Sequence, residues 1–166
     1  MMYRGKRVNG IWITGQLLTV HITTGTDKAF LIDRNVTMYD LHNNLGAVMY
    51  EVFPETLGKS TRRTDKHGRK VFEGDILIVN GFQTAEVKFG TYKPDSEYEP
   101  DEHIGFYAES ADEFYDETHR MIQQELPAVL PYSEVIGNIH DGVDSDKLPK
   151  NMRCTVNADG TLKMPF

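Results

Sequence analysis

The sequence has very little cysteine and no long apolar run, and these absences exclude whole classes of protein. A single cysteine among 166 residues, Cys154, excludes an intrachain disulfide framework and any multi-cysteine zinc or iron–sulfur site. No apolar stretch approaches the ~18 residues that a membrane-spanning helix needs, and no apolar segment follows the basic start at residues 1–7. We therefore expect a soluble, globular protein of a reducing compartment, with no secretory signal and no membrane partner.

Catalytic and cofactor motifs are also missing. Gly58-Lys59-Ser60-Thr61 resembles the end of a phosphate-binding P-loop, but Phe53 stands where that motif needs its first glycine. The sequence contains neither a His-x-x-x-His pair nor a Gly-x-Ser-x-Gly nucleophile elbow. No motif around Cys154 marks it as a nucleophile. We therefore predict a non-catalytic protein without a cofactor.

Two acidic groups suggest metal sites only weakly. Asp116 and His119 lie three residues apart and could share a metal with Glu113, but an exposed acidic helix face is the favoured interpretation. The aspartates of residues 141–146 miss the spacing of an EF-hand loop, which needs a glycine at its sixth position and a glutamate at its twelfth. No metal site is predicted.

The net charge of −7 is unevenly distributed along the chain. Residues 1–80 carry 11 Lys/Arg and 8 Asp/Glu, whereas residues 81–166 carry 7 and 17. The acidic excess lies in residues 95–117, and the basic excess is concentrated in one segment: Lys59, Arg62, Arg63, Lys66, Arg69 and Lys70. This segment is either a solvated surface loop, which we favour, or a positive patch for an acidic partner such as a phosphate backbone.

Short strand signals run through most of the chain. Asn9-Gly10 and Asn80-Gly81 predict hairpin turns, since both residue types tolerate positive φ. Asp65 and Gly68 predict a tight turn over residues 64–70, and Glu73-Gly74-Asp75 predicts another. Runs of apolar, β-branched or alternating residues predict strands at 11–14, 17–22, 29–32, 47–53, 76–79, 85–89, 105–108 and 132–139.

One helix is predicted near residues 110–126. Ser110-Ala111-Asp112-Glu113 has the form of a capping box, and Pro127 would stop the helix. Its apolar face would contain Phe114, Met121, Ile122 and Leu126. Residues 155–163 resemble a small hairpin within the tail.

These elements predict an α+β protein that is mainly β, not a doubly wound α/β fold. The succession of strand, turn and strand from Val71 to Phe89 fits a small, strongly bent barrel of the SH3-like kind.

Two longer stretches are more specific than any of these patterns. The first runs from Pro54-Glu55-Thr56-Leu57-Gly58 through Thr64-Asp65-Lys66-His67-Gly68 to Phe72-Glu73-Gly74-Asp75-Ile76. The second is Glu134-Val135-Ile136-Gly137-Asn138-Ile139-His140. With a basic start at residues 3–7 followed by Gly10-Ile11-Trp12, their order and spacing resemble the YopX family of phage and prophage proteins. The resemblance covers roughly residues 3–148 and leaves 149–166 as a C-terminal tail.

The resemblance implies an N-terminal α+β portion, about residues 1–58, joined to an SH3-like barrel, about residues 59–141. It also implies a phage or prophage origin and the cytoplasm of a bacterial host, but it supplies no catalytic residues. A structural interpretation suits the matched residues: Gly68 and Gly74 allow tight turns, Asp75 caps its turn, and Gly137 permits a bend or a close approach. Glu73 and Asn138 belong to the same motifs.

The sequence departs from the family pattern just before the Asp65 turn. Family members often carry an aromatic residue and then Thr-Gly-Leu there, where this chain has Ser60-Thr61-Arg62-Arg63-Thr64. The change removes a packing aromatic and a glycine and adds two charges.

Two functions from different classes fit these observations. The favoured one is a phage or prophage accessory protein that acts as a non-catalytic binding module for a host or phage protein. The alternative is a nucleic-acid-binding accessory or regulatory protein that uses residues 59–70, and it needs aromatic side chains on the same face for stacking. Its binding residues would be Arg62, Arg63, Lys66, Arg69 and Lys70. The aromatic candidates (Trp12, Phe72, Phe89, Phe106 and Tyr107) are more readily explained as core. A homo-oligomer that pairs strand edges is a further expectation.

Overall fold

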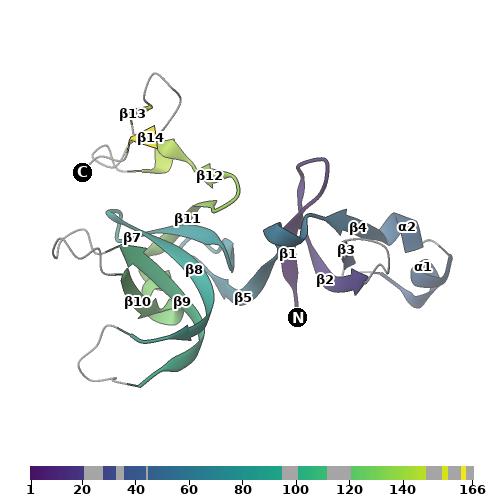
Figure 1. Ribbon diagram of the computed structural model, residues 1–166, viewed down its shortest axis with the longest axis horizontal. Coiled ribbons are helices and arrows are strands. Elements are labelled where there is room, and N and C mark those ends of the chain that lie inside the picture. Colours follow the sequence, from purple (N-terminus) through teal and green to yellow (C-terminus); the bar gives the residue numbers. More distant parts are fainter. Residues whose placement is uncertain are drawn as a thin grey trace. The chain divides into compact units, whose positions relative to one another are not determined.

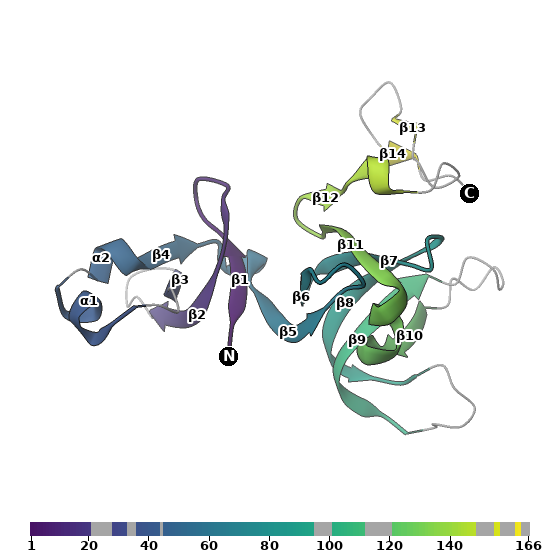
Figure 2. The same cartoon turned by 180° about the vertical axis from the view of Figure 1, so that it is seen from behind.

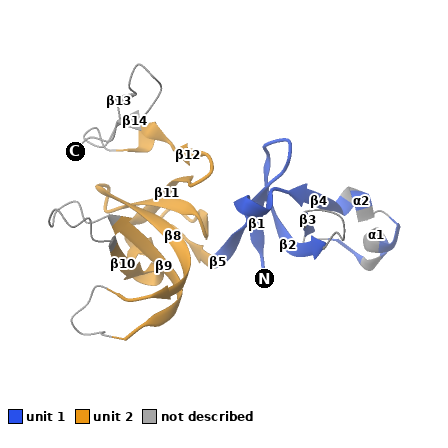
Figure 3. Cartoon of the chain, viewed as in Figure 1, with its two compact units in different colours: residues 1–61 blue, residues 62–166 orange. Residues whose placement is uncertain are grey.

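Antiparallel strands dominate the computed structural model, which describes residues 1–20, 28–32, 36–43, 45–94, 101–111, 121–148, 155–156 and 162–163 (Figure 1). The chain is mainly β, as predicted, and its described residues form two six-stranded sheets and a two-stranded one. It divides between Thr61 and Arg62 into two units, which are coloured separately in Figure 3. None of the described helices is long and apolar enough to cross a membrane.

The first unit is built on an antiparallel sheet. Its strands are β1 (Tyr3–Lys6), β2 (Trp12–Val20), β3 (Lys28–Ile32) and β4 (Met49–Val52), and the short helices α1 (Met38–Asn43) and α2 (Leu45–Val48) precede β4. The sheet order is β4-β3-β2-β1-β5-β6, where β5 (Gly58–Thr64) starts in the first unit and ends in the second, beside β6 (Lys70–Phe72). The predicted Asn9-Gly10 hairpin is present, because β1 pairs with β2 and Gly10 has a φ of 84°.

The core of the first unit lies on one face of this sheet. Ala29, Leu31 and Val52 are buried there, and the partly buried side chains of Tyr3, Ile13, Leu17 and Leu57 pack against them. Position 15 has no room for a side chain, since a Cβ atom there would lie 2.4 Å from the carbonyl oxygen of Ile32.

The second unit holds the other large sheet, ordered β10-β9-β8-β7-β11-β12. Its strands are β7 (Asp75–Val79), β8 (Gln83–Tyr92), β9 (His103–Ala111), β10 (Met121–Glu125), β11 (Ser133–Asn138) and β12 (Gly142–Val143). The predicted Asn80-Gly81 turn joins β7 to β8 with φ values of 52° and 78°, the conformation that a type I′ turn requires. A short helix, α3 (Leu126–Val129), and a helical turn at Leu130–Tyr132 connect β10 to β11.

Two apolar clusters stabilise the second unit. The larger one combines the sheet with the α3 connection, and Figure 2 shows α3 beside β9 and β10. Its buried members are Val71, Leu77, Val79, Ala85, Val87, Ala108, Leu126, Val129, Leu130 and Val135. The smaller one consists of Ile78, Ile136 and Leu148. Leu148 follows the helical turn Ser145–Lys147, so this cluster attaches the segment after β12 to β7 and β11.

The predicted helix over residues 110–126 is wrong at residues 110–111 and 121–125, and Leu126 is the first residue of α3. Ser110 and Ala111 end β9, and residues 121–125 form β10, which pairs with β9 in an antiparallel register from Met121↔Ala111 to Glu125↔Tyr107. A partner strand satisfies the backbone of β9, and this non-local gain outweighs the helical spacing of the apolar residues. Pro127 lies in the first turn of α3, where a missing N–H costs little. Residues 112–120, including Phe114, lie outside the described residues.

The large sheet of the second unit is not a closed barrel. Among the described residues, β10 pairs only with β9 and β12 pairs only with β11, so both ends of the sheet order stay open. In the tail, β13 (Thr155–Val156) pairs with β14 (Leu162–Lys163).

Candidate functional site

The Asp65 turn is organised by one carboxylate. The backbone N–H groups of His67 and Arg69 both donate to Oδ1 of Asp65 over 2.9 Å, and Gly68 N–H donates to the Asp65 carbonyl. Gly68 has a φ of 78°, which glycine adopts without steric cost. Local hydrogen bonding therefore closes the turn between β5 and β6.

The same carboxylate connects the turn to a distant strand. Oδ2 of Asp65 accepts a 3.0 Å hydrogen bond from the N–H of Val135 on β11, and the guanidinium of Arg69 donates to the Val135 carbonyl over 3.0 Å. Burial raises the pKa of the Asp65 carboxyl, but the three donating amides outweigh burial, so that its pKa lies below its usual value. Asp65 is therefore an anionic link between two segments that are far apart in sequence.

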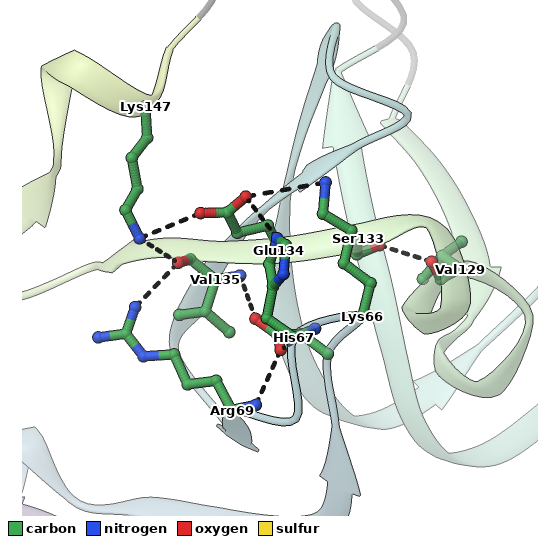
Figure 4. Close-up of polar contacts among 9 residues, drawn as sticks. Lys66, His67, Arg69, Val129, Ser133, Glu134, Val135 and Lys147 are labelled. Atoms are coloured by element: carbon green, nitrogen blue, oxygen red, sulfur yellow. Dashed lines mark hydrogen bonds and ion pairs between the residues drawn. The ribbon is translucent and has the colours of Figure 1, made fainter.

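A second carboxylate, Glu134, gathers three basic side chains beside this link (Figure 4). Its oxygens lie 3.1 Å from Nζ of Lys147, 3.2 Å from Nε2 of His67 and 3.7 Å from Nζ of Lys66. The hydrogen bond from Lys147 lowers the pKa of Glu134, and His67 lowers it further. These groups are partly exposed, so each pair contributes little stability, but together they direct Lys66 and His67 toward β11.

The basic residues predicted to bind a partner lie in different surroundings in the structure. Lys66 and Arg69 contact β11 through Glu134 and Val135. Lys70 is exposed on β6. Only Arg62 and Arg63 lie together at a surface depression, at the end of β5. Three of the five predicted binding residues therefore do not line this depression.

This depression is a groove of about 360 Å³. One wall is formed by Arg62, Arg63, Thr64 and Asp65, and the other by Pro127, Leu130 and Pro131 from the α3 connection. The helix pattern does not indicate the second wall, because it predicts for Pro127 only that it stops a helix. The available signal was the pair of prolines flanking an apolar run at residues 126–131.

Arg62 has a strained backbone within this groove. Its φ of 60° is in the left-handed region that favours glycine. An L-residue held there costs about 1–2 kcal/mol. Strain of this kind tends to persist at functional positions, where a particular side chain is needed.

Replacing Arg62 with glycine is therefore expected to raise the free energy of unfolding by up to about 1 kcal/mol, because the relief of strain exceeds the greater freedom of glycine in the unfolded chain. Urea unfolding of the full chain measures the change. Arg63→Gly is the matched control, since Arg63 has no positive φ. It is expected to lose about 0.5–1 kcal/mol. Equal destabilisation by both substitutions would contradict the assignment of strain to Arg62.

The remaining motif residues support turns and close backbone approaches. Asp75 is fully buried and its Oδ2 accepts a 2.8 Å hydrogen bond from Phe72 N–H across the turn that contains Glu73 and Gly74, whose φ is 80°. Oδ1 of Asn138 accepts hydrogen bonds from the N–H groups of His140 and Asp141. Gly137 lies where the register of β11 shifts, and β12 approaches it closely.

None of the aromatic candidates lines the groove. Phe72 and Tyr107 are buried, and Phe106 packs against the larger core cluster. Phe89 is more exposed and its ring centroid lies 4.9 Å from that of Phe106. Trp12 lies in the first unit, where the guanidinium carbon of Arg4 is 4.8 Å from its ring centroid. The sequence does not predict this contact between Arg4 and Trp12.

No group of three His, Cys, Asp or Glu side chains in the described part of the chain is arranged to hold a metal ion. Glu113, Asp116, His119 and Cys154 lie outside the described residues.

Fold and groove together define a small, mainly β protein with two sheet units and a polar–apolar surface groove on the second one. The model of the YopX protein family matches residues 2–143, and the chain belongs to this family. No curated protein matches the sequence significantly.

Proposed function

We propose that this YopX family member is a non-catalytic binding module that recognises an acidic, partly apolar segment of a host or phage protein. The observation that carries the proposal is the groove in which Arg62 and Arg63 face Pro127, Leu130 and Pro131. Family membership supports a phage or prophage accessory protein that acts in the cytoplasm of a bacterial host.

The chemistry of the groove favours a peptide. Guanidinium groups bind carboxylates through paired hydrogen bonds, whereas proline and leucine side chains offer an apolar surface without competing polar groups. A segment that alternates acidic and apolar residues can satisfy both walls at once. Since Arg62 is held in a strained conformation that a glycine would avoid, the guanidinium at this position has a use that offsets the strain.

An SH3-like architecture is part of this proposal. The consecutive strands β7, β8, β9 and β10 form a meander, and β11 returns to pair with β7 after a short helical connection. This topology supports a small barrel-like sheet whose connections present the binding surface. The groove lies at one of those connections, between α3 and the end of β5.

Binding of nucleic acid by residues 59–70 is less well supported. Lys66 and Arg69 contact β11, so fewer cations of this segment face a polyanion. None of the residues that line the groove is aromatic, although single-strand binding generally needs stacking surfaces. The acidic excess of residues 81–166 also opposes a polyanion near this unit.

A fluorescence anisotropy titration with a short labelled peptide of alternating aspartate and leucine tests the peptide proposal. We expect the full chain to bind this peptide and the double variant Arg62→Gln/Arg63→Gln to bind it at least about tenfold more weakly, because two charge-assisted contacts are lost. Lys70→Gln is the control, because Lys70 is exposed on the adjacent strand and does not line the groove.

Lys70→Gln is expected to change the affinity less than about twofold, because an exposed charge that does not line the groove contributes little. Equal affinity of the double variant and the native chain, or equal binding of a peptide of alternating lysine and leucine, would exclude the groove as an acidic-peptide site. If the native chain instead bound a labelled oligonucleotide, and both Arg62→Gln/Arg63→Gln and Lys70→Gln bound it more weakly, residues 59–70 would be the nucleic-acid site.

A further inference from the structure

Besides the groove on the second unit, the protein has a surface with distinctive chemistry on the first unit. It lies on the face of the sheet opposite the core. Successive residues of a strand point to opposite faces, so Arg4 and Lys6 share one face and Gly5 lies on the other. The register pairs Lys6 with Trp12 and Arg4 with Thr14, which places all four side chains on the same face. A Cβ atom at Gly5 would contact Val52 and Leu31, so the opposite face is the core face.

On this face an indole ring is flanked by two cations. The guanidinium carbon of Arg4 lies 4.8 Å from the Trp12 ring centroid and Nζ of Lys6 lies 5.9 Å from it, both within the range of a cation–π interaction. All three side chains are half-exposed, and Thr14, Gln16 and Leu18 extend an exposed surface along β2. Here, unlike at the Arg62–Arg63 groove, basic and aromatic groups lie together.

The local charge also differs from that of the whole chain. Residues 1–61 carry six Lys/Arg and five Asp/Glu, so the first unit does not share the acidic excess. Strand alternation places Glu51 on this face as well, but Lys28 pairs with it over 2.9 Å. A polyanion approaching Arg4 and Lys6 therefore meets little repulsion from the described side chains of this face, and salt screens distant charges.

We propose that the Arg4–Lys6–Trp12 face of the first unit binds single-stranded nucleic acid. Unpaired bases stack on aromatic rings and on guanidinium planes, so the Arg4–Trp12 pair provides a stacking platform. The positive charges of Arg4 and Lys6 neutralise adjacent phosphates. A duplex keeps its bases stacked inside and cannot use the platform. This site is independent of the groove on the second unit, because it uses different residues.

Trp12 is the single tryptophan of the chain, so its fluorescence reports directly on this face. We expect a short oligothymidylate to quench the emission of the full-length protein at low salt, and a duplex of equal length to quench it much less. The affinity should fall with salt with a logarithmic slope of about −1.4, since each of two phosphate contacts on a single strand contributes about −0.7.

Substitutions locate the site. Arg4→Gln/Lys6→Gln is expected to weaken binding at least about tenfold and to flatten the salt dependence. Lys59→Gln is the matched control, since Lys59 pairs in register with Tyr3 and therefore lies on the other face, and it should leave the affinity within about twofold. Circular dichroism verifies that each variant is folded.

Absence of quenching by the oligothymidylate at low salt would overturn the proposal. So would equal affinity of the double variant and the native chain, or equal binding of the duplex. Quenching by polyglutamate but not by the oligothymidylate would also overturn it, and would instead assign the face to an acidic protein.

Discussion

Replacing Asp65 with alanine is expected to lower the free energy of unfolding by roughly 3–4 kcal/mol. The Asp65 side chain is 5% exposed and accepts hydrogen bonds from the N–H groups of His67, Arg69 and Val135. Alanine leaves these donors without their acceptor, and it also breaks the link between the turn and β11. Urea unfolding followed by circular dichroism measures the loss.

Asp65→Asn is the matched control, because asparagine keeps the size of the side chain and one acceptor oxygen. We expect it to lose less stability than alanine, since either the turn or the Val135 contact can survive. If the free energy of unfolding of Asp65→Ala lay within about 0.5 kcal/mol of the native value, solvent would replace the carboxylate and the link would contribute nothing to stability.

The Asp65 link should also depend on pH in one direction. Because the pKa of Asp65 is depressed in the folded state, its stabilisation is complete above its unfolded pKa, near about 3.9, and is lost as the pH falls through the lower folded value. The stability difference between the native chain and Asp65→Asn should therefore shrink in acid. A difference that grows as the pH falls below about 4 would contradict this assignment.

Replacing Gly137 with alanine is expected to cost roughly 3 kcal/mol or more. A Cβ atom at this position would lie 2.1 Å from the carbonyl oxygen of Gly142 and 2.7 Å from Cα of Val143. Both are backbone atoms of the β11–β12 pair, so they cannot move aside as a flexible side chain could. Relief of the clash requires β12 to separate from β11, which also disturbs the segment that carries Lys147 and Leu148.

Gly105→Ala is the control for Gly137→Ala. Gly105 also lies in a strand of the second unit, but a Cβ atom there would meet only a Tyr92 ring carbon at 4.0 Å, an ordinary contact. This variant should retain the native stability within about 1 kcal/mol or gain slightly. If thermal unfolding showed equal losses for both variants, the close approach at Gly137 would not explain the effect.

Local chemistry accounts for the parts of the fold that the sequence predicted well. Asn9-Gly10 and Asn80-Gly81 determine hairpin turns because these residues accept positive φ at little cost. The Asp65–Gly68 turn forms for a similar reason, as its hydrogen bonds span only a few residues. Such signals are complete within a short segment, so they can be interpreted without knowledge of the partner strands.

The predicted helix over residues 110–126 failed because a non-local interaction decided the conformation. The helical spacing joins Met121 and Ile122 to Phe114 and Leu126, yet residues 121–125 supply the partner strand that β9 needs. The choice between helix and strand there depends on β9 being present beside them. No property of residues 121–125 alone contains this information.

The candidate sites show the same division. The basic and aromatic residue types were evident in the sequence, and so were the turns that carry some of them. Only the tertiary structure turned Lys66 and Arg69 toward β11, left Arg62 and Arg63 in a groove opposite Pro127, Leu130 and Pro131, and brought Arg4 over Trp12.

The presence of a single cysteine determined, from the sequence alone, that this chain contains no disulfide framework within itself. The sequence also determined its turns, its mainly β character and its family. Tertiary structure decided which segments pair beyond the local hairpins and which charged side chains lie at a candidate binding surface, because such contacts join residues that are distant in the sequence, such as Asp65 and Val135, 70 positions apart.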